Sequence, residues 1–337
     1  MSGTVATRRR GRPLVGLLRL TSFNIFALFV VLGVVFTLLS PSYRMVDPDN
    51  LSILFGLGAE FNMIALAVGL LMICGEFDLS VGSILVFCSF VLMELVNAGV
   101  NIAIASALTI ATGCAIGLLN GLITVRAGIP SFITTLGTMM IWRGVTMFWS
   151  EGLQKPFDVS SYVVFGKIFS EPVGGAVPVQ LLWFVGLAVV LWLVVHRMKL
   201  GNWISITGDN RLAARAMGVN TDAVKMGSFA LVGLVCALVA IMQISRTGAF
   251  SSRAGDGWEM KALAAVVIGG TSMTGGVGSM AGVFWGALTV SLIENALAVL
   301  RIPYFWSYTV FGVVIVASVV ATAVVARRRG SIGRETS

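Results

Sequence analysis

Charged residues and histidine are scarce in this sequence. Charged side chains occupy 11% of its 337 positions and hydrophobic ones occupy 57%. Soluble domains typically contain about 25% charged and about 45–50% apolar residues. A water-soluble core could not bury this much apolar surface, so the chain must have lipid as its solvent. The composition predicts one all-α membrane domain.

The residue types that catalytic and metal sites need are few, and they are not suitably spaced. There is one histidine, His196, and the four cysteines lie in apolar segments with no CxxC spacing. This argues against a catalytic triad, a metal site and a disulfide framework. No GxxxxGK[ST] sequence occurs, so the chain has no P-loop of its own for ATP. We expect no catalytic residue, no cofactor and no metal ion.

Long apolar segments dominate what remains. A membrane-spanning helix needs about 17–25 such residues, and this length predicts a polytopic bundle of about ten helices. We expect residues 20–326 to form a single transmembrane domain between a basic tail at 1–19 and a second tail at 327–337. The predicted spans are 20–40, 51–74, 79–97, 101–125, 131–150, 179–196, 226–245, 258–274, 280–300 and 305–326.

The net charge of +8 indicates membrane orientation rather than a nucleic-acid partner. Arginine clusters at 8–12 and 327–329 flank the first and last spans, and such clusters stay in the cytoplasm. We therefore expect both termini in the cytoplasm, as in a multi-pass protein of the bacterial inner membrane. The loops near 75–78, 126–130, 197–225 and 275–279 then face the cytoplasm, and those near 151–178 and 246–257 face outward.

Residues 197–225 form a polar, basic island between two long apolar segments. We expect a short helix from Asp209 to Met217, with Asp209 as its N-cap and Gly218 ending it in the left-handed conformation. Such a helix could dock a cytoplasmic partner; the alternative is a solvated connector. The candidate docking residues are Asp209, Asn210, Arg211, Ala213, Ala214, Arg215, Met217 and Gly218.

Polar residues inside the apolar segments are candidates for a solute path. A charge in hydrocarbon costs at least roughly 2.5–3.5 kcal/mol, so these groups should face protein, water or an interface. They could instead pair with one another, as Glu60, Arg143 and Glu294 could, or bond their own helix backbone. The candidates are Glu60, Asn62, Ser83, Asn120, Thr134, Thr135, Arg143, Glu294 and Asn295.

An outward loop, the start of the third span and a glycine stripe each lead to a further prediction. Arg246, Arg253 and Asp256 lie on an outward loop and could contact a soluble partner or be merely solvated. Asp78 and Ser80 are expected to cap the third span at its cytoplasmic end. The glycine stripe at Gly113, Gly117 and Gly121 favours close helix packing, with a bending site as the alternative.

Four segments together resemble the ribose-type permease family of ABC importers. They read GEFDLSVGS (75–83), NGLITVRAGIPSFITTLGTMMIWRG (120–144), GDNRLAARAMGVN (208–220) and GWEMKALAAVVIGGTSMTGGVGS (257–279). The similarity runs in order from about residue 50 to 325. One departure is Glu76, which stands where the family usually has a second glycine.

The resemblance implies the non-catalytic membrane subunit of a bacterial monosaccharide importer that works by alternating access. Its implied partners are a cytoplasmic ABC ATPase, a periplasmic sugar-binding protein and a second permease copy or related permease chain. The alternative is an ion-coupled secondary transporter or channel for a small polar solute. The island at 197–225 argues against that alternative, because a self-sufficient carrier needs no dock for an ATPase.

Overall fold

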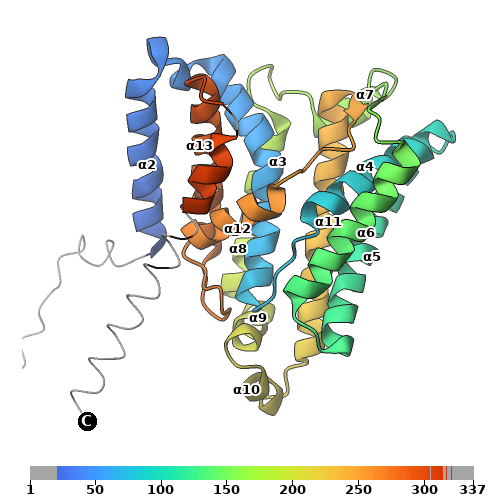
Figure 1. Ribbon diagram of the computed structural model, residues 1–337, viewed down its shortest axis with the longest axis vertical. Coiled ribbons are helices and arrows are strands. Elements are labelled where there is room, and N and C mark those ends of the chain that lie inside the picture. Colours follow the sequence, from blue (N-terminus) through green and yellow to red (C-terminus); the bar gives the residue numbers. More distant parts are fainter. Residues whose placement is uncertain (1–20, 304, 314–315, 317–319, 321–337) are drawn as a thin grey trace, which may run out of the picture.

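The computed structural model describes residues 21–303, 305–313, 316 and 320, and it is a bundle of helices (Figure 1). Six of the described helices are long and apolar enough to cross a membrane, and α6 (Ser131–Ser150) has 20 residues but is more polar. This confirms the predicted all-α polytopic class. The six are α2 (Thr21–Leu39), α3 (Pro48–Ile73), α5 (Ile102–Ala127), α8 (Val179–Arg197), α11 (Thr221–Thr247) and α13 (Met280–Val299).

The orientation of the termini and the number of spans stay predictions. The tails at 1–19 and 327–337 lie outside the described residues, as does much of the predicted span at 305–326. Short elements make up the connections. They are η1 (Pro41–Val46), β1 (Lys155–Pro156), α7 (Val163–Phe169), α9 (Lys199–Asp209), α10 (Arg211–Ala216) and β2 (Ala249–Phe250). The strands β1 and β2 form a two-residue antiparallel pair.

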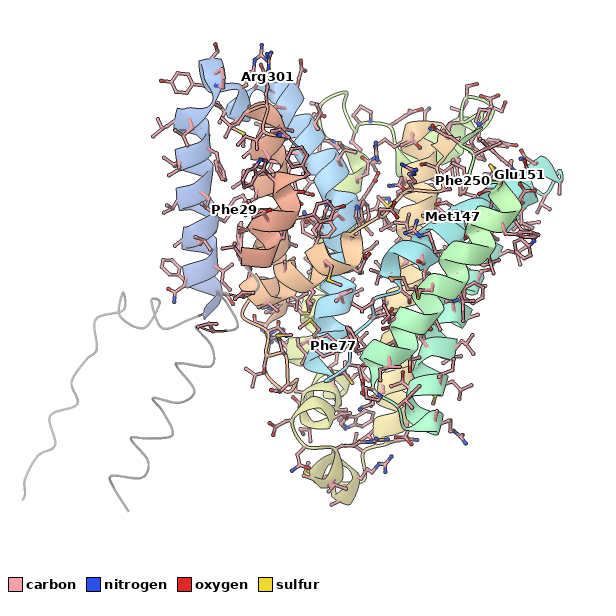
Figure 2. The ribbon with its side chains drawn as sticks, in the orientation of Figure 1. Phe29, Phe77, Met147, Glu151, Phe250 and Arg301 are labelled. Carbon is pink, nitrogen blue, oxygen red and sulfur yellow. The ribbon has the colours of Figure 1, made fainter. Side chains whose placement is uncertain are left out.

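Two shorter helices, α4 (Val81–Asn97) and α12 (Trp258–Ile268), begin inside the bundle rather than at its surface. The chain reaches each of them through an extended segment that turns back into the bundle (Figure 1). We call residues 74–80 the first return segment and residues 248–257 the second. In Figure 2, Phe77 marks the first of these segments in the lower half of the bundle, and Phe250 marks the second in the upper half.

The structure at the two return segments contradicts two expectations from the sequence, the span at 258–274 and the position of Asp78 and Ser80. Helix α12 has 11 residues, which extend about 16 Å at 1.5 Å per residue. That is too short for a hydrocarbon layer of about 30 Å, so the predicted span at 258–274 is wrong. Asp78 and Ser80 were expected at a cytoplasmic helix end, yet both are buried inside the bundle. An apolar run in the sequence does not reveal whether its helix starts at the membrane surface or within the protein.

The helices occur in two groups with opposite directions. In Figure 1, α3 descends, the first return segment climbs back, and α4 and α5 follow. Later, α11 ascends, the second return segment descends, and α12 and α13 follow. We call the end of the bundle that carries α10 the α10 end, and the opposite end the far end.

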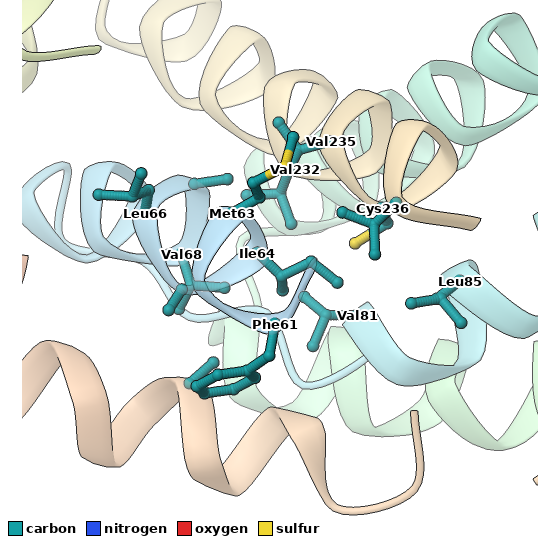
Figure 3. Packing of buried hydrophobic residues seen from close by; sticks show 14 of the residues in the cluster. Phe61, Met63, Ile64, Leu66, Val68, Val81, Leu85, Val232, Val235 and Cys236 are labelled. Atoms are coloured by element: carbon teal, nitrogen blue, oxygen red, sulfur yellow. The ribbon is translucent and has the colours of Figure 1, made fainter. Parts of the chain in front are cut away.

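The core lies around α3, which is buried on nearly every side from Ala59 to Ile73. Figure 3 shows residues of α3 packed against Val232 and Val235 of α11 and against Val81 and Leu85 of α4. A helix that is apolar all round suits this central place. Helix α2, in contrast, leaves apolar side chains such as Val31 exposed, as expected of a surface that faces lipid.

The glycine stripe of α5 packs against α11. A Cβ on Gly117 would lie 2.2 Å from the Phe229 carbonyl oxygen, and one on Gly113 would lie 2.4 Å from that of Gly233. Only glycine allows backbones to approach this closely. The packing interpretation of Gly113, Gly117 and Gly121 is therefore confirmed.

Candidate functional site

A cavity of about 370 Å³ lies among α3, α11, α12 and α13, toward the far end. We call it the outer cavity. Its polar lining residues come from all four helices and from the segment after α13, and its aromatic ones are Phe61 and Trp258. The polar residues are Glu60, Gln243, Arg246, Lys261, Ser291, Glu294, Asn295 and Ser307.

Two ion pairs line the outer cavity. Arg246 on α11 donates two hydrogen bonds to the Glu60 carboxylate, at 2.7 Å from Nε and 2.9 Å from Nη2. This bidentate geometry is the strongest that an arginine and a carboxylate form. Lys261 on α12 pairs with Glu294 on α13. Because each cation has a carboxylate beside it, the cavity is polar but close to neutral in net charge.

An aromatic pair completes the lining. The rings of Phe61 and Trp258 meet edge to face, with centroids 5.8 Å apart. A cavity with convergent hydrogen-bonding groups and an aromatic surface is typical of small-molecule sites. The hydroxyl groups of an uncharged polar solute could exchange hydrogen bonds with these groups, while its carbon skeleton contacts the rings.

Some of the sequence-predicted path residues lie here. Glu60, Glu294 and Asn295 line the cavity. Asn62 lies just behind it and accepts a hydrogen bond of 2.8 Å from Ser291. Asn295 exchanges two hydrogen bonds, of 2.9 and 3.0 Å, with Asn50.

Other lining residues were missed or misplaced by the sequence analysis. Arg246 was expected on an outward surface, and that expectation is wrong because its guanidinium turns inward to Glu60. Gln243 and Lys261 were missed altogether. Their one signal is spacing: Gln243 stands three residues before Arg246, and Lys261 three after Trp258, so each shares a helix face with its neighbour.

Two predicted path residues, Asn120 and Thr135, hold the first return segment instead of lining the cavity, together with Ser131, which was not predicted. Asn120 on α5 donates to the Ser80 hydroxyl at 2.8 Å. Thr135 on α6 accepts from the Leu79 N–H at 3.1 Å, and Ser131 accepts from the Phe77 N–H at 3.0 Å. These contacts satisfy backbone groups that an extended segment leaves without partners inside a membrane.

Arg143 on α6 does the same for the second return segment. It donates to the carbonyl oxygens of Ser252 and Ala254, at 3.0 and 3.3 Å, and pairs with Asp256 at 2.9 Å. The expected pairing of Arg143 with Glu60 or Glu294 is therefore wrong. Helix α6 thus contacts both return segments.

The start of α4 also meets the second return segment. A Cβ on Gly82, in the first turn of α4, would lie 2.4 Å from the Gly255 carbonyl oxygen. Ser83 on α4 and Thr134 on α6 are buried, and their hydroxyls have no hydrogen-bond partner within the described part of the chain. Neither lines the outer cavity. Arg253 is exposed, as predicted.

At the α10 end, the predicted helix over 209–217 is replaced by two helices with a break at Asn210. Asn210 caps α10, because its Oδ1 accepts from the Ala213 N–H at 3.0 Å, whereas Asp209 is the last residue of α9. Gly218 has the predicted positive φ, at +81°. The expected N-cap role of Asp209 is therefore wrong, while the glycine stop is confirmed.

The exposed face of α10 also differs from the predicted one. Ala214 is fully buried within the chain, so it cannot meet a partner without unfolding α10. Leu212 and Met217 are 80% and 61% exposed. Arg211 and Arg215 both reach Asp222 of α11, at 2.7 and 2.6 Å, and so fix α10 to the bundle.

A glycine junction joins α9 to the rest of the bundle, and the sequence analysis missed it. A Cβ on Gly208 would lie 2.1 Å from the Ile73 carbonyl oxygen at the end of α3. The Gly276 N–H donates to that same oxygen at 2.9 Å, and Gly276 in turn lies against Asp209. The ends of α3 and α9 and the loop before α13 therefore meet at one point.

Known proteins share this chain's sequence over most of its length. Residues 50–319 match the family described as the branched-chain amino acid transport system permease component. The chain belongs to this permease family. The permease is 33% identical to the ribose import permease RbsC of Escherichia coli K12 over 298 residues, which are 88% of this chain and 91% of RbsC.

A second kind of relative is similarly close. The permease is 31% identical to the autoinducer 2 import system permease LsrC of Escherichia coli SMS-3-5 over 294 residues, 86% of this chain and 84% of LsrC. It is 30% identical to LsrC of Yersinia enterocolitica over 302 residues, 88% of this chain and 79% of that protein. No solved structure matches. The permease is a multi-pass protein of the inner membrane.

Proposed function

We propose that this permease is the non-catalytic membrane subunit of an ATP-driven ABC importer and moves a monosaccharide into the cytoplasm by alternating access. The outer cavity carries the proposal, because its paired charges and its aromatic pair suit an uncharged solute with many hydroxyl groups. The names of its relatives, a ribose import permease and an autoinducer 2 import permease, support the same substrate class.

The solute path would run from the outer cavity past the two return segments. The Trp258 N–H, at the start of α12, donates to the Gly255 carbonyl oxygen at 3.1 Å, and Gly255 touches Gly82. The contact between the start of α4 and the second return segment thus lies directly beside the cavity wall and would form the barrier in this conformation. Discontinuous helices of this kind are common at the solute sites of transporters.

The α10 end would face the cytoplasm and dock the ATPase. The chain has no P-loop, so the energy must come from a partner, and Leu212, Ala213 and Met217 offer an exposed, partly apolar face. The glycine junction at Gly208 would pass the movement of α9 and α10 to α3 and the first return segment. Residues 20–326 form the permease domain in this proposal, between the tails at 1–19 and 327–337.

The far end would face the periplasm and receive a sugar-binding protein on the loop at 151–178 and around Arg253 and Asp256. A second permease copy, or a related permease chain, would complete the transporter. The family resemblance supports both partners, and the high exposure of Arg253 and Asp256 agrees with a contact surface.

Reconstitution tests the proposal. The permease is placed in liposomes with an ABC ATPase and a sugar-binding protein from the same organism, and uptake of labelled ribose and related sugars is measured. We expect uptake that needs ATP and the binding protein. Uptake driven by an ion gradient without the ATPase would show the secondary transporter instead.

A pair of tryptophan variants tests the cavity itself. Trp258→Ala removes an aromatic wall and should lower uptake by about tenfold or more, because burying an aromatic ring contributes roughly 1.5–3 kcal/mol. Trp192→Ala is the control, since Trp192 stacks on His196 outside the outer cavity. Equal uptake by the two variants would place the solute elsewhere.

A further inference from the structure

A second polar cavity lies at the α10 end, separate from the outer cavity. It has a volume of about 230 Å³ and lies between the turn that joins α5 to α6, the first return segment, and the start of α10 and α11. We call it the inner pocket. Its lining includes Thr124, Glu76, Arg211, Lys225 and the turn residues 128–130.

Two buried donors in the inner pocket have no partner within the described part of the chain. The Thr124 side chain is 6% exposed, and its hydroxyl makes no hydrogen bond. The Nε of Arg211 is equally without a partner, although the Nη2 of the same guanidinium reaches Asp222. Buried donors are normally paired, so two that line one pocket indicate an acceptor bound there.

The charges around the inner pocket favour an anionic acceptor. Lys225 pairs with Glu76, and only 12% and 10% of these two side chains are exposed. Arg211 and Arg215 share one oxygen, Oδ1 of Asp222. Three cations therefore face two carboxylates, and one positive charge is left over beside the unpaired Nε. Guanidinium groups with free N–H donors bind phosphate and carboxylate groups well.

We propose that the inner pocket binds the phosphate group of a small phosphorylated ligand, held by the Thr124 hydroxyl, the Arg211 Nε–H and the Lys225 ammonium. The group could belong to a sugar phosphate in the cytoplasm or to the headgroup of an anionic lipid. That the pocket faces the cytoplasm rests on the proposed function, whereas the binding itself does not. A bound phosphate would join α10, through Arg211, to α5, through Thr124, and so restrain the docking helix.

Binding to the full-length permease in a neutral detergent tests this site. Calorimetry with inorganic phosphate and with ribose 5-phosphate is compared across the wild type and three variants. Thr124→Val removes one donor without changing shape much and should weaken binding by about 3- to 10-fold, the value of one hydrogen bond. Thr109→Val is the matched control on the same helix, because the Thr109 hydroxyl already donates to the Ala105 carbonyl at 2.8 Å.

Glu76→Gln gives a result that a purely structural role would not produce. It frees Lys225 from its carboxylate and raises the net charge of the pocket by one. Phosphate should then bind more tightly, by about fivefold or more, because a nearby negative charge that repels it has been removed. A variant that merely damages the fold would weaken binding.

Lipid nanodiscs separate the two sources of phosphate. The same four proteins are placed in phosphatidylcholine alone or with phosphatidylglycerol, and ribose 5-phosphate binding is repeated. If phosphatidylglycerol lowers the binding of ribose 5-phosphate to the wild type but not to Thr124→Val, the pocket binds a lipid headgroup. If phosphatidylglycerol leaves the binding of ribose 5-phosphate unchanged, the pocket binds a soluble phosphate. The proposal is overturned if no probe binds, or if Thr124→Val and Thr109→Val behave alike. Failure of sugar uptake in liposomes would overturn the proposed function without changing these binding results.

Discussion

At the scale of single residues, the ion pair between Glu60 and Arg246 decides the character of the outer cavity. Only 1% of the Glu60 side chain is exposed, and both of its oxygens are engaged by Arg246. Removing one partner of a buried pair leaves a charge without compensation, whereas replacing both with neutral groups costs much less. The pair therefore links the stability of the fold to the polarity of the cavity.

Arg246→Met should destabilise the permease by roughly 3–5 kcal/mol, because it leaves Glu60 buried and unpaired. The double variant Glu60→Gln with Arg246→Gln should recover much of this loss. Thermal unfolding in detergent measures both. The control is Lys155→Ala, which breaks an exposed pair with Glu94 at 3.5 Å and should change stability by at most about 1 kcal/mol. Equal losses for Arg246→Met and Lys155→Ala would contradict the argument.

At the scale of elements, α9 and α10 act as one unit with a buried side and an exposed side. Ala214 faces the bundle, and Leu212 and Met217 face away from it. Asp222 binds both arginines of α10, so the unit cannot swing freely about Gly218. A push on α10 therefore reaches the bundle both through Asp222 on α11 and through the junction at Gly208.

Leu212→Glu should abolish docking of the ATPase while the permease is still made and inserted, since the added charge lies on an exposed surface of α10. Co-purified ATPase and sugar uptake are measured. Leu153→Glu, at the far end and 57% exposed, should keep its ATPase. If Leu212→Glu keeps its ATPase and transports normally, α10 is only a connector.

Gly208→Ala should separate docking from transport. Its Cβ would collide with the Ile73 carbonyl oxygen at 2.1 Å, which forces the end of α9 away from α3. We expect the ATPase to remain bound and uptake to fall about tenfold or more. Gly227→Ala lies on α11 with nothing within 4 Å of the new Cβ, and it should behave as wild type. A transport-competent Gly208→Ala would remove the junction from the mechanism.

At the scale of the whole molecule, two groups of helices run in opposite directions and each contains a return segment. The return segments enter from opposite ends, which places the loop 269–279 at the α10 end and the loop 151–178 at the far end. This arrangement leaves few backbone groups facing lipid without a partner, because α5 and α6 supply the hydrogen bonds that the extended stretches need.

Cysteine labelling tests the arrangement. Val277→Cys and Met217→Cys are at the α10 end, and Val173→Cys is at the far end; all three positions are more than half exposed. A membrane-impermeant maleimide applied to intact cells should label only Val173→Cys. In opened membrane vesicles, where the reagent reaches both sides of the membrane, all three cysteines should react. Labelling of Val277→Cys in intact cells would contradict the proposed orientation.

Much of the fold could be predicted from the sequence, because lipid demands long apolar helices and these are visible as runs of residues. The breaks before α4 and α12 were expected as surface loops near 75–78 and 246–257, but the sequence does not reveal that these segments turn back into the bundle. Asp78 and Ser80 were expected to cap the third span, but no side chain caps α4. The Asp78 carboxylate instead accepts from the Ser80 N–H at 2.8 Å, in the turn before that helix. The partners Glu60 and Arg246 stand 186 positions apart, and only the fold brings them together.

Helix α6 binds one return segment through Ser131 and Thr135 and the other through Arg143. Any displacement of α6 therefore acts on the inner and outer halves of the proposed barrier at once. Damage to the two sets of anchors should not add: once one set is lost, losing the other changes little, as in a double-mutant cycle with a large interaction energy. A barrier held by one helix opens and closes as a single cooperative unit. Few molecules are then open to both sides of the membrane at once, so little solute leaks through.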